Sequence, residues 1–239
     1  MTVYRVGTFN LEYGRKIGVV HDEVQIALMQ NDLDILILQE AADYFHDLSR
    51  IGKYNYYCGN SSVSHRQVGI LVKETHHVTG FKALQAGDGW TTISGAKHGP
   101  VATPQLRVNG ELGIKGLHLP TPSLWVKGKL TGPAERIDDL KETMAQVMNW
   151  LRPVVDDRPS LPKIAAGDWN ESPKTKGAYS PAWVASQTGA QIHTTDEKSP
   201  HGNIDYFMVK GKVKIRNVYQ DDKLKEKSDH ELRVLVCEV

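Results

Sequence analysis

Residues 164–173 read IAAGDWNESP, an apolar run that ends in a polar turn. The apolar half is typical of a short buried strand, and Gly167 and Pro173 indicate where that strand stops. Asp168 and Asn170 are two residues apart, so in extended chain their side chains project to the same side. A carboxylate beside a carboxamide at a strand end can hold a hydrated divalent cation or orient a water molecule on a phosphate, although the same residues also describe an ordinary Asx turn.

The composition is that of a soluble globular protein, with 40% hydrophobic and 24% charged residues among 239. The net charge is +1, from 29 Lys+Arg against 28 Asp+Glu. This balance argues against a strong overall electrostatic footprint for nucleic acid and leaves a local basic patch open. Cys58 and Cys237 are too few for a disulfide framework or a zinc cage.

The N-terminus enters a strand pattern at once, without the apolar core of a signal peptide, and no apolar run reaches membrane-spanning length. We therefore expect a cytoplasmic protein without a transmembrane segment, and a monomer. Neither a repeat nor a shift in composition marks a linker, so residues 1–239 are expected to form a single domain.

The pattern of elements predicts an α/β fold. Asn109-Gly110 separates two β runs and is a strong hairpin signal. Only two long helices are indicated, over residues 21–31 and from Pro133 to about Leu151, which is too few for a purely parallel doubly wound sheet. We expect a four-layer α/β sandwich, in which two packed sheets, mostly antiparallel or mixed, are flanked by helices.

Polar residues recur where predicted strands end. Asn10 follows the run 3–9, and Glu40 comes shortly after the apolar run 33–38. Singly, such residues are more often solvated side chains, turn caps or core histidines than ligands. Together they form a set of carboxylates, carboxamides and histidines that suits Mg²⁺ or Mn²⁺ better than structural zinc. The set consists of Asn10, Glu40, His118, Asp168, Asn170, Asp205, Asp229 and His230.

The motifs that carry these residues resemble, in order, those of the endonuclease/exonuclease/phosphatase superfamily, the deoxyribonuclease I-like proteins. Each motif is short, but six in the right order over nearly the whole chain are specific. They are Thr8-Phe9-Asn10, Leu38-Gln39-Glu40, His118, Gly167-Asp168-Trp169-Asn170, Ile204-Asp205-Tyr206 and Ser228-Asp229-His230. The resemblance implies the four-layer sandwich and metal-dependent hydrolysis of a phosphoester.

The resemblance also implies a metal site. Glu40 would be the principal ligand, with Asn10 beside it and Asp229 nearby. The expected ion is Mg²⁺ or Mn²⁺, and whether one or two ions act is left open.

Five residues would act on the substrate according to the same resemblance. Asp168 would align or deprotonate the attacking water, and Asn170 would hold the phosphate or the water. His230 would contact the scissile phosphate, while Asp205 would fix its tautomer and raise its basicity. His118 would help to protonate the leaving group.

These expectations favour a divalent-metal-dependent phosphodiesterase, a nuclease acting on DNA or RNA. The alternative is a phosphatase or phosphodiesterase for a small-molecule, inositol-phosphate or lipid phosphoester. A catalytically silent binding module is less favoured, because none of the motif residues is missing. Glu171, His193 and the charged run 221–227 are expected at the surface.

Overall fold

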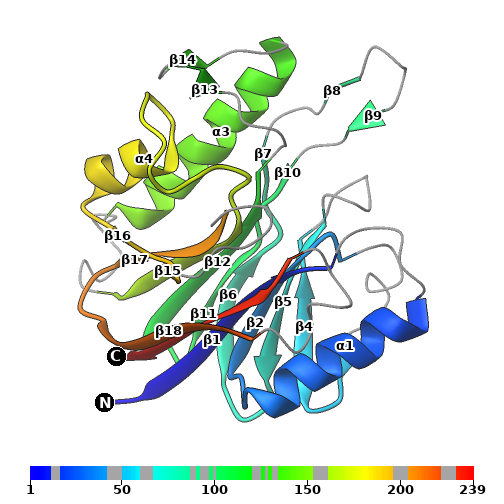
Figure 1. Cartoon of the computed structure of the whole chain (residues 1–239). Coiled ribbons are helices and arrows are strands. Elements are labelled where there is room, and N and C mark those ends of the chain that lie inside the picture. Colours follow the sequence, from blue (N-terminus) through cyan, green and yellow to red (C-terminus); the bar gives the residue numbers. More distant parts are fainter. Residues whose placement is uncertain are drawn as a thin grey trace.

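The computed structural model describes most of the chain, and the described elements form two large β-sheets with helices on their outer faces (Figure 1). The described residues are 1–11, 17–41, 50–59, 67–86, 90–91, 97–98, 101–119, 125–126, 129–130, 134–152, 161–195, 204–221 and 230–239. Asp229, one of the expected metal ligands, lies outside them.

The first sheet has seven strands in the order β18-β19-β1-β2-β5-β4-β3. Only β1 and β2 run parallel, and the other neighbours are antiparallel. The strands are β1 (Val3–Asn10), β2 (Ile35–Gln39), β3 (Arg50–Ile51), β4 (Tyr54–Cys58), β5 (Val68–Lys73), β18 (Lys214–Asp221) and β19 (Leu232–Glu238).

The second sheet has six strands in the order β16-β17-β15-β12-β11-β6, with β12 and β15 parallel. The hairpin predicted at Asn109-Gly110 joins β11 to β12, and both turn residues have positive φ, 52° and 70°. The strands are β6 (Val78–Lys82), β11 (Gln105–Val108), β12 (Leu112–His118), β15 (Lys163–Asp168), β16 (Gln191–His193) and β17 (Asp205–Lys210).

Short two-stranded ribbons accompany the sheets. They pair β7 (Gln85–Ala86) with β10 (Val101–Ala102), β8 (Trp90–Thr91) with β9 (Lys97–His98), and β13 (Trp125–Val126) with β14 (Lys129–Leu130).

Three apolar clusters separate four layers. The central cluster lies between the inner faces of the two sheets. A second cluster packs α1 (Ile17–Gln30) against the seven-stranded sheet, and a third packs α3 (Ala134–Leu151) and α4 (Pro181–Thr188) against the six-stranded sheet. The predicted sandwich of two mixed sheets flanked by helices is therefore confirmed. No described helix has both the length and the apolarity needed to cross a membrane.

Strand alternation determines which side chains face the space between the sheets. In β15, Ile164 and Ala166 belong to the central cluster, so Asp168 continues the same inward-facing row. Gly167 has φ 154°, and a Cβ there would lie 1.8 Å from the Leu117 carbonyl oxygen. Glycine is thus required for β15 to stay paired with β12 just before the polar turn.

Candidate active site

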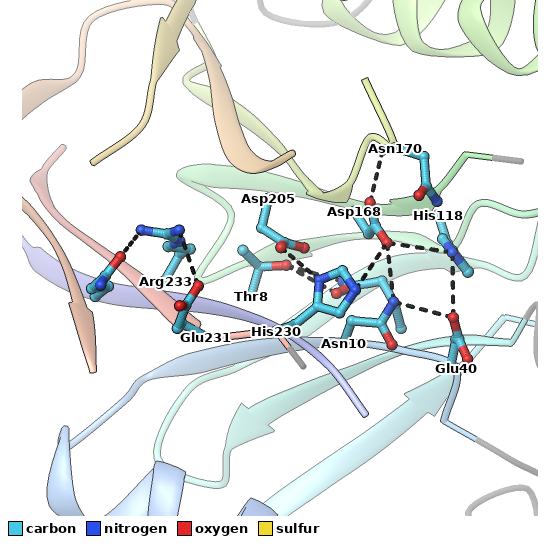
Figure 2. A network of polar contacts seen from close by, with 12 residues as sticks. Thr8, Asn10, Glu40, His118, Asp168, Asn170, Asp205, His230, Glu231 and Arg233 are labelled. Carbon is cyan, nitrogen blue, oxygen red and sulfur yellow. Dashed lines mark hydrogen bonds and ion pairs between the residues drawn. The ribbon is translucent and has the colours of Figure 1, made fainter. Parts of the chain in front are cut away.

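The predicted site residues that the structure describes, which are all of them except Asp229, lie close together where strands of both sheets end (Figure 2). His118, Asp168 and Asp205 come from three adjacent strands and are direct cross-strand partners, His118 with Asp168 and Asp168 with Asp205. On each strand, alternate residues face the central cluster, and these three residues continue that alternation, so their side chains lie in the space between the sheets. Register alone therefore brings together residues that are far apart in sequence.

The seven-stranded sheet contributes Asn10 and Glu40 from the ends of two parallel strands. Asn10 Nδ2 donates to Glu40 Oε1 at 3.2 Å and to Asp168 Oδ2 at 3.0 Å, which joins the two sheets across the site. Glu40 has φ 51°, a left-handed conformation that is uncommon for a non-glycine residue. Its side chain is 22% exposed, whereas Asp168 is 1% exposed, so Glu40 lies nearer to solvent.

Asp205 and His230 form a buried pair. His230 Nδ1 lies 2.8 Å from Asp205 Oδ2, and a carboxylate at that distance requires Nδ1 to carry the proton and donate it. The other ring nitrogen, Nε2, is directed toward Asp168, 3.9 Å from its Oδ2 (Figure 2). Asp205 therefore holds the His230 ring with Nε2 facing Asp168.

His118 approaches the same carboxylates from the other side. Its Nε2 is 3.7 Å from Glu40 Oε1 and 3.6 Å from Asp168 Oδ2. These separations are too long for good hydrogen bonds but short enough for electrostatic attraction to a protonated ring. The two histidines therefore flank Asp168 (Figure 2).

Burial and, to a smaller extent, the neighbouring Asp205 carboxylate raise the pKa of Asp168 from its ordinary range to about 8. His230, the backbone N–H of Asn170 and the Asn10 side chain oppose this rise. A carboxylate so desolvated accepts either a proton or a nearby cation.

Asn170 shapes the turn that follows Asp168. Its backbone N–H donates to Asp168 Oδ1 at 2.7 Å, and its Nδ2 donates to the Leu119 carbonyl oxygen at 2.7 Å. With φ 48°, the residue adopts the left-handed conformation that asparagine tolerates. The Asx turn that the sequence allowed is therefore present, and it holds the Asp168 carboxylate at the end of β15.

The donor atoms fit a hard divalent cation. One ligand atom each from Asp168, Asp205 and His230 lie within 4.8 Å of one another, and this group could hold a metal ion. Oδ1 of Asp205 is buried and has no hydrogen-bond partner among the described residues. Asn10 and Glu40 add a carboxamide and a carboxylate next to this group, which is the oxygen-rich chemistry that Mg²⁺ and Mn²⁺ prefer.

Sequence reasoning missed a buried polar layer behind the site. Gln39 Nε2 donates to Thr8 Oγ1 at 3.0 Å. Thr8 lies two residues before Asn10 on β1, and Gln39 is the cross-strand partner of Asn10 on β2. Arg233 and Glu231 form an ion pair of 3.3 Å in which both side chains are 1% exposed (Figure 2). The sequence signal for this layer was the occurrence of polar residues, such as Glu231 and Arg233, at alternate positions of otherwise apolar strands.

Two residues expected at the surface are buried. Glu171 is 7% exposed, because its carboxylate accepts from the Ser172 backbone N–H and the Thr175 hydroxyl and so closes the loop after the site. Asp221 is 9% exposed and accepts from Asn31 Nδ2. His193 is half-buried, and the rest of the run 222–227 lies outside the described residues.

No protein-family model and no curated protein matches the sequence. Solved structures do resemble this one over its whole length. An endonuclease/exonuclease/phosphatase from Bacteroides vulgatus has a TM-score of 0.68 at 14% identity and covers 100% of both chains. The human Nocturnin catalytic domain with bound sulfate has a TM-score of 0.68 at 15% identity, covering 99% of this chain and 94% of that one.

A third similar structure is D. rerio TDP2 complexed with a single-strand DNA product, with a TM-score of 0.63 at 13% identity and 100% coverage of both chains. At such identities, structural similarity establishes the fold and not the activity. The architecture suggested by the sequence motifs is thus confirmed, and the chain has the deoxyribonuclease I-like fold of the endonuclease/exonuclease/phosphatase structures.

Proposed function

We propose that this protein is a divalent-metal-dependent phosphoric ester hydrolase that cleaves a phosphodiester with an activated water, acting as a nuclease on DNA or RNA. The observation that carries the proposal is the convergence of Asn10 and Glu40 from one sheet with His118, Asp168 and Asp205 from the other. This convergence occurs at a single end of the sandwich, beside His230.

Glu40 and Asn10 would hold the metal ion, with Asp229 as a further ligand from outside the described residues. Glu40 suits this role because it is more exposed than Asp168 and Asp205, the other described carboxylates of the site, and accepts a hydrogen bond from Asn10. When bound, the cation would neutralise charge on the phosphoryl oxygens and lower the pKa of bound water.

The remaining groups would act on the water and the phosphate. Asp168, desolvated and flanked by two histidines, would orient the attacking water and accept its proton. His230, balanced by the buried Asp205 carboxylate, would donate from Nε2 to a phosphoryl oxygen. His118 would protonate the leaving oxygen, and Asn170 would fix the turn and contribute its carboxamide to the phosphate or the water.

A nucleic-acid substrate is supported by the similarity to TDP2, whose structure holds a single-strand DNA product. The near-neutral net charge means that affinity would depend on local basic side chains rather than on the whole surface. The alternative substrate, a small phosphoester, is left for the experiment to decide.

The test is a cleavage panel of plasmid DNA, single-stranded DNA and RNA oligonucleotides, and bis-p-nitrophenyl phosphate. Each is incubated with wild-type protein in Mg²⁺, in Mn²⁺ or in EDTA. Metal-dependent cutting of a nucleic acid supports the proposal in full. If only bis-p-nitrophenyl phosphate is hydrolysed, the protein is a phosphodiesterase but the proposed nuclease activity is wrong. Turnover in EDTA equal to that in Mg²⁺ contradicts metal dependence.

A further inference from the structure

A cavity of about 600 Å³ opens on the outer face of the six-stranded sheet, the face opposite the inter-sheet space. Its walls are β6, β11, β12 and the C-terminal end of α3, which includes Asn149 and Trp150. The residues at its floor belong to the strands that α3 leaves partly uncovered at this edge of the sheet.

Strand register arranges basic side chains in the floor. Lys115, Gln105 and Lys82 are successive cross-strand partners on β12, β11 and β6. The next outward-facing row, two residues along, has a glycine at its centre, and the Trp150 ring and the Lys163 side chain pack close to that glycine. This row consists of Lys163, Gly113 and Arg107.

The lining is strongly positive. Lys82, Arg107, Lys115 and Lys163 all border the cavity, and no described residue in its lining carries a carboxylate. Lys163 has a structural role, because its Nζ donates to the Trp150 and Arg152 carbonyl oxygens at the end of α3. Lys82, Arg107 and Lys115 line the same space from three neighbouring strands.

Lys115 is the unusual member, because its side chain is fully buried. Its Nζ donates to the Thr103 carbonyl oxygen at 3.2 Å and to Gln105 Oε1 at 3.4 Å, both neutral acceptors. A buried ammonium without a carboxylate partner is costly, and an anion in the cavity would offset that cost. Burial accordingly lowers the pKa of Lys115 to about 7.

This cavity is distinct from the candidate active site. His118 and Lys115 lie three residues apart on β12, so they project to opposite faces of the sheet. His118 faces the seven-stranded sheet and Lys115 faces the side of α3. A ligand here would not occupy the site at the end of the sandwich.

We propose that this cavity is a binding site for a small anion of the phosphate class, held by Lys82, Arg107 and Gln105 above the buried charge of Lys115. A phosphate group offers several acceptor oxygens and about two negative charges, which suits this basic lining better than the single charge of a monocarboxylate. The volume admits free phosphate, pyrophosphate or the phosphate end of a small organic molecule.

The experiment is a thermal-unfolding titration of the full chain in EDTA at constant ionic strength. The probes are inorganic phosphate, pyrophosphate, adenosine monophosphate and acetate. For wild type, a phosphate-class probe at a hundredfold excess over its Kd should raise Tm by about 5–10 °C. Stronger binding of adenosine monophosphate than of phosphate indicates a phosphorylated organic ligand, and equal binding indicates free phosphate; each result supports the site.

Variants then locate the binding. Lys115→Met and the exposed Lys82→Met should each abolish most of the shift, and Lys82→Met keeps the test valid if the buried variant fails to fold. Lys141→Met, an exposed lysine on α3 outside the cavity, is the matched control and should keep the shift. His230→Ala should keep it as well, which separates this cavity from the active site. No shift with any phosphate-class probe, an equal shift with acetate, or a shift retained in Lys82→Met overturns the proposal.

Discussion

The sharpest prediction concerns the buried pair of Asp205 and His230. Asp205→Asn preserves shape but removes the negative charge 2.8 Å from His230 Nδ1. A hydrogen bond to a charged group contributes about 1.5–3 kcal/mol, and each 1.36 kcal/mol of activation barrier changes a rate tenfold. If that charge balances a protonated His230 in the transition state, kcat should fall about 10- to 150-fold.

The assay is steady-state hydrolysis, under saturating metal, of whichever phosphodiester wild type cleaves. We expect kcat to fall while KM changes little, because the lost interaction acts when charge develops on the phosphoryl oxygens. Asp32→Asn is the matched control, since Asp32 pairs with Arg5 and Lys73 on the surface. A kcat within about threefold of wild type in Asp205→Asn would refute the role of the pair.

Three further predictions concern stability. Gly167→Ala should lower the free energy of unfolding by about 3 kcal/mol or more in urea titrations, because its Cβ would lie 1.8 Å from the Leu117 oxygen; Gly52→Ala, with φ 56° and open space around it, should cost only about 1 kcal/mol. The pKa of Asp168 is raised to about 8. Without metal, its contribution to the free energy of unfolding is therefore complete below about pH 4 and is lost as the pH rises toward 8. The unfolding free energy of Asp168→Asn in EDTA should therefore fall less over that interval than that of wild type, and parallel curves would contradict the burial argument. The pKa of Lys115 is lowered to about 7, so its contribution to the free energy of unfolding increases as the pH rises from about 7 to 10. Lys115→Met should lack this increase. If wild type and variant showed the same dependence of unfolding free energy on pH, the argument from a buried charge without a carboxylate partner would be contradicted.

The fold could be predicted because local signals agreed with the final topology. The Asn109-Gly110 turn, the apolar run before Glu40 and the strand ending at Asp168 each carry their own pattern. Site residues could be identified individually for the same reason, since a polar side chain directly after a buried strand is conspicuous.

The way in which the site residues come together could not be derived from local sequence patterns. Asn10 and Asp168 are 158 positions apart and meet only because both sheets end at the same level. Lys115 and Arg233 were missed because a single charged residue within a strand gives no sign of whether it faces solvent or the interior. Glu171 was misplaced because its partners, Ser172 and Thr175, follow it in an irregular loop.

The central claim is that this polar cluster is a metal-dependent hydrolytic site, and a metal titration of Glu40→Gln tests it most directly. Wild type and variant are compared for hydrolysis of the cleaved phosphodiester across a range of Mg²⁺ and Mn²⁺ concentrations. Glu40 is partly exposed, so the variant should fold normally. We predict that it needs far more metal for half-maximal activity and loses at least about a hundredfold in kcat/KM at low metal. An unchanged metal dependence with full activity would place the catalytic metal elsewhere and contradict the account.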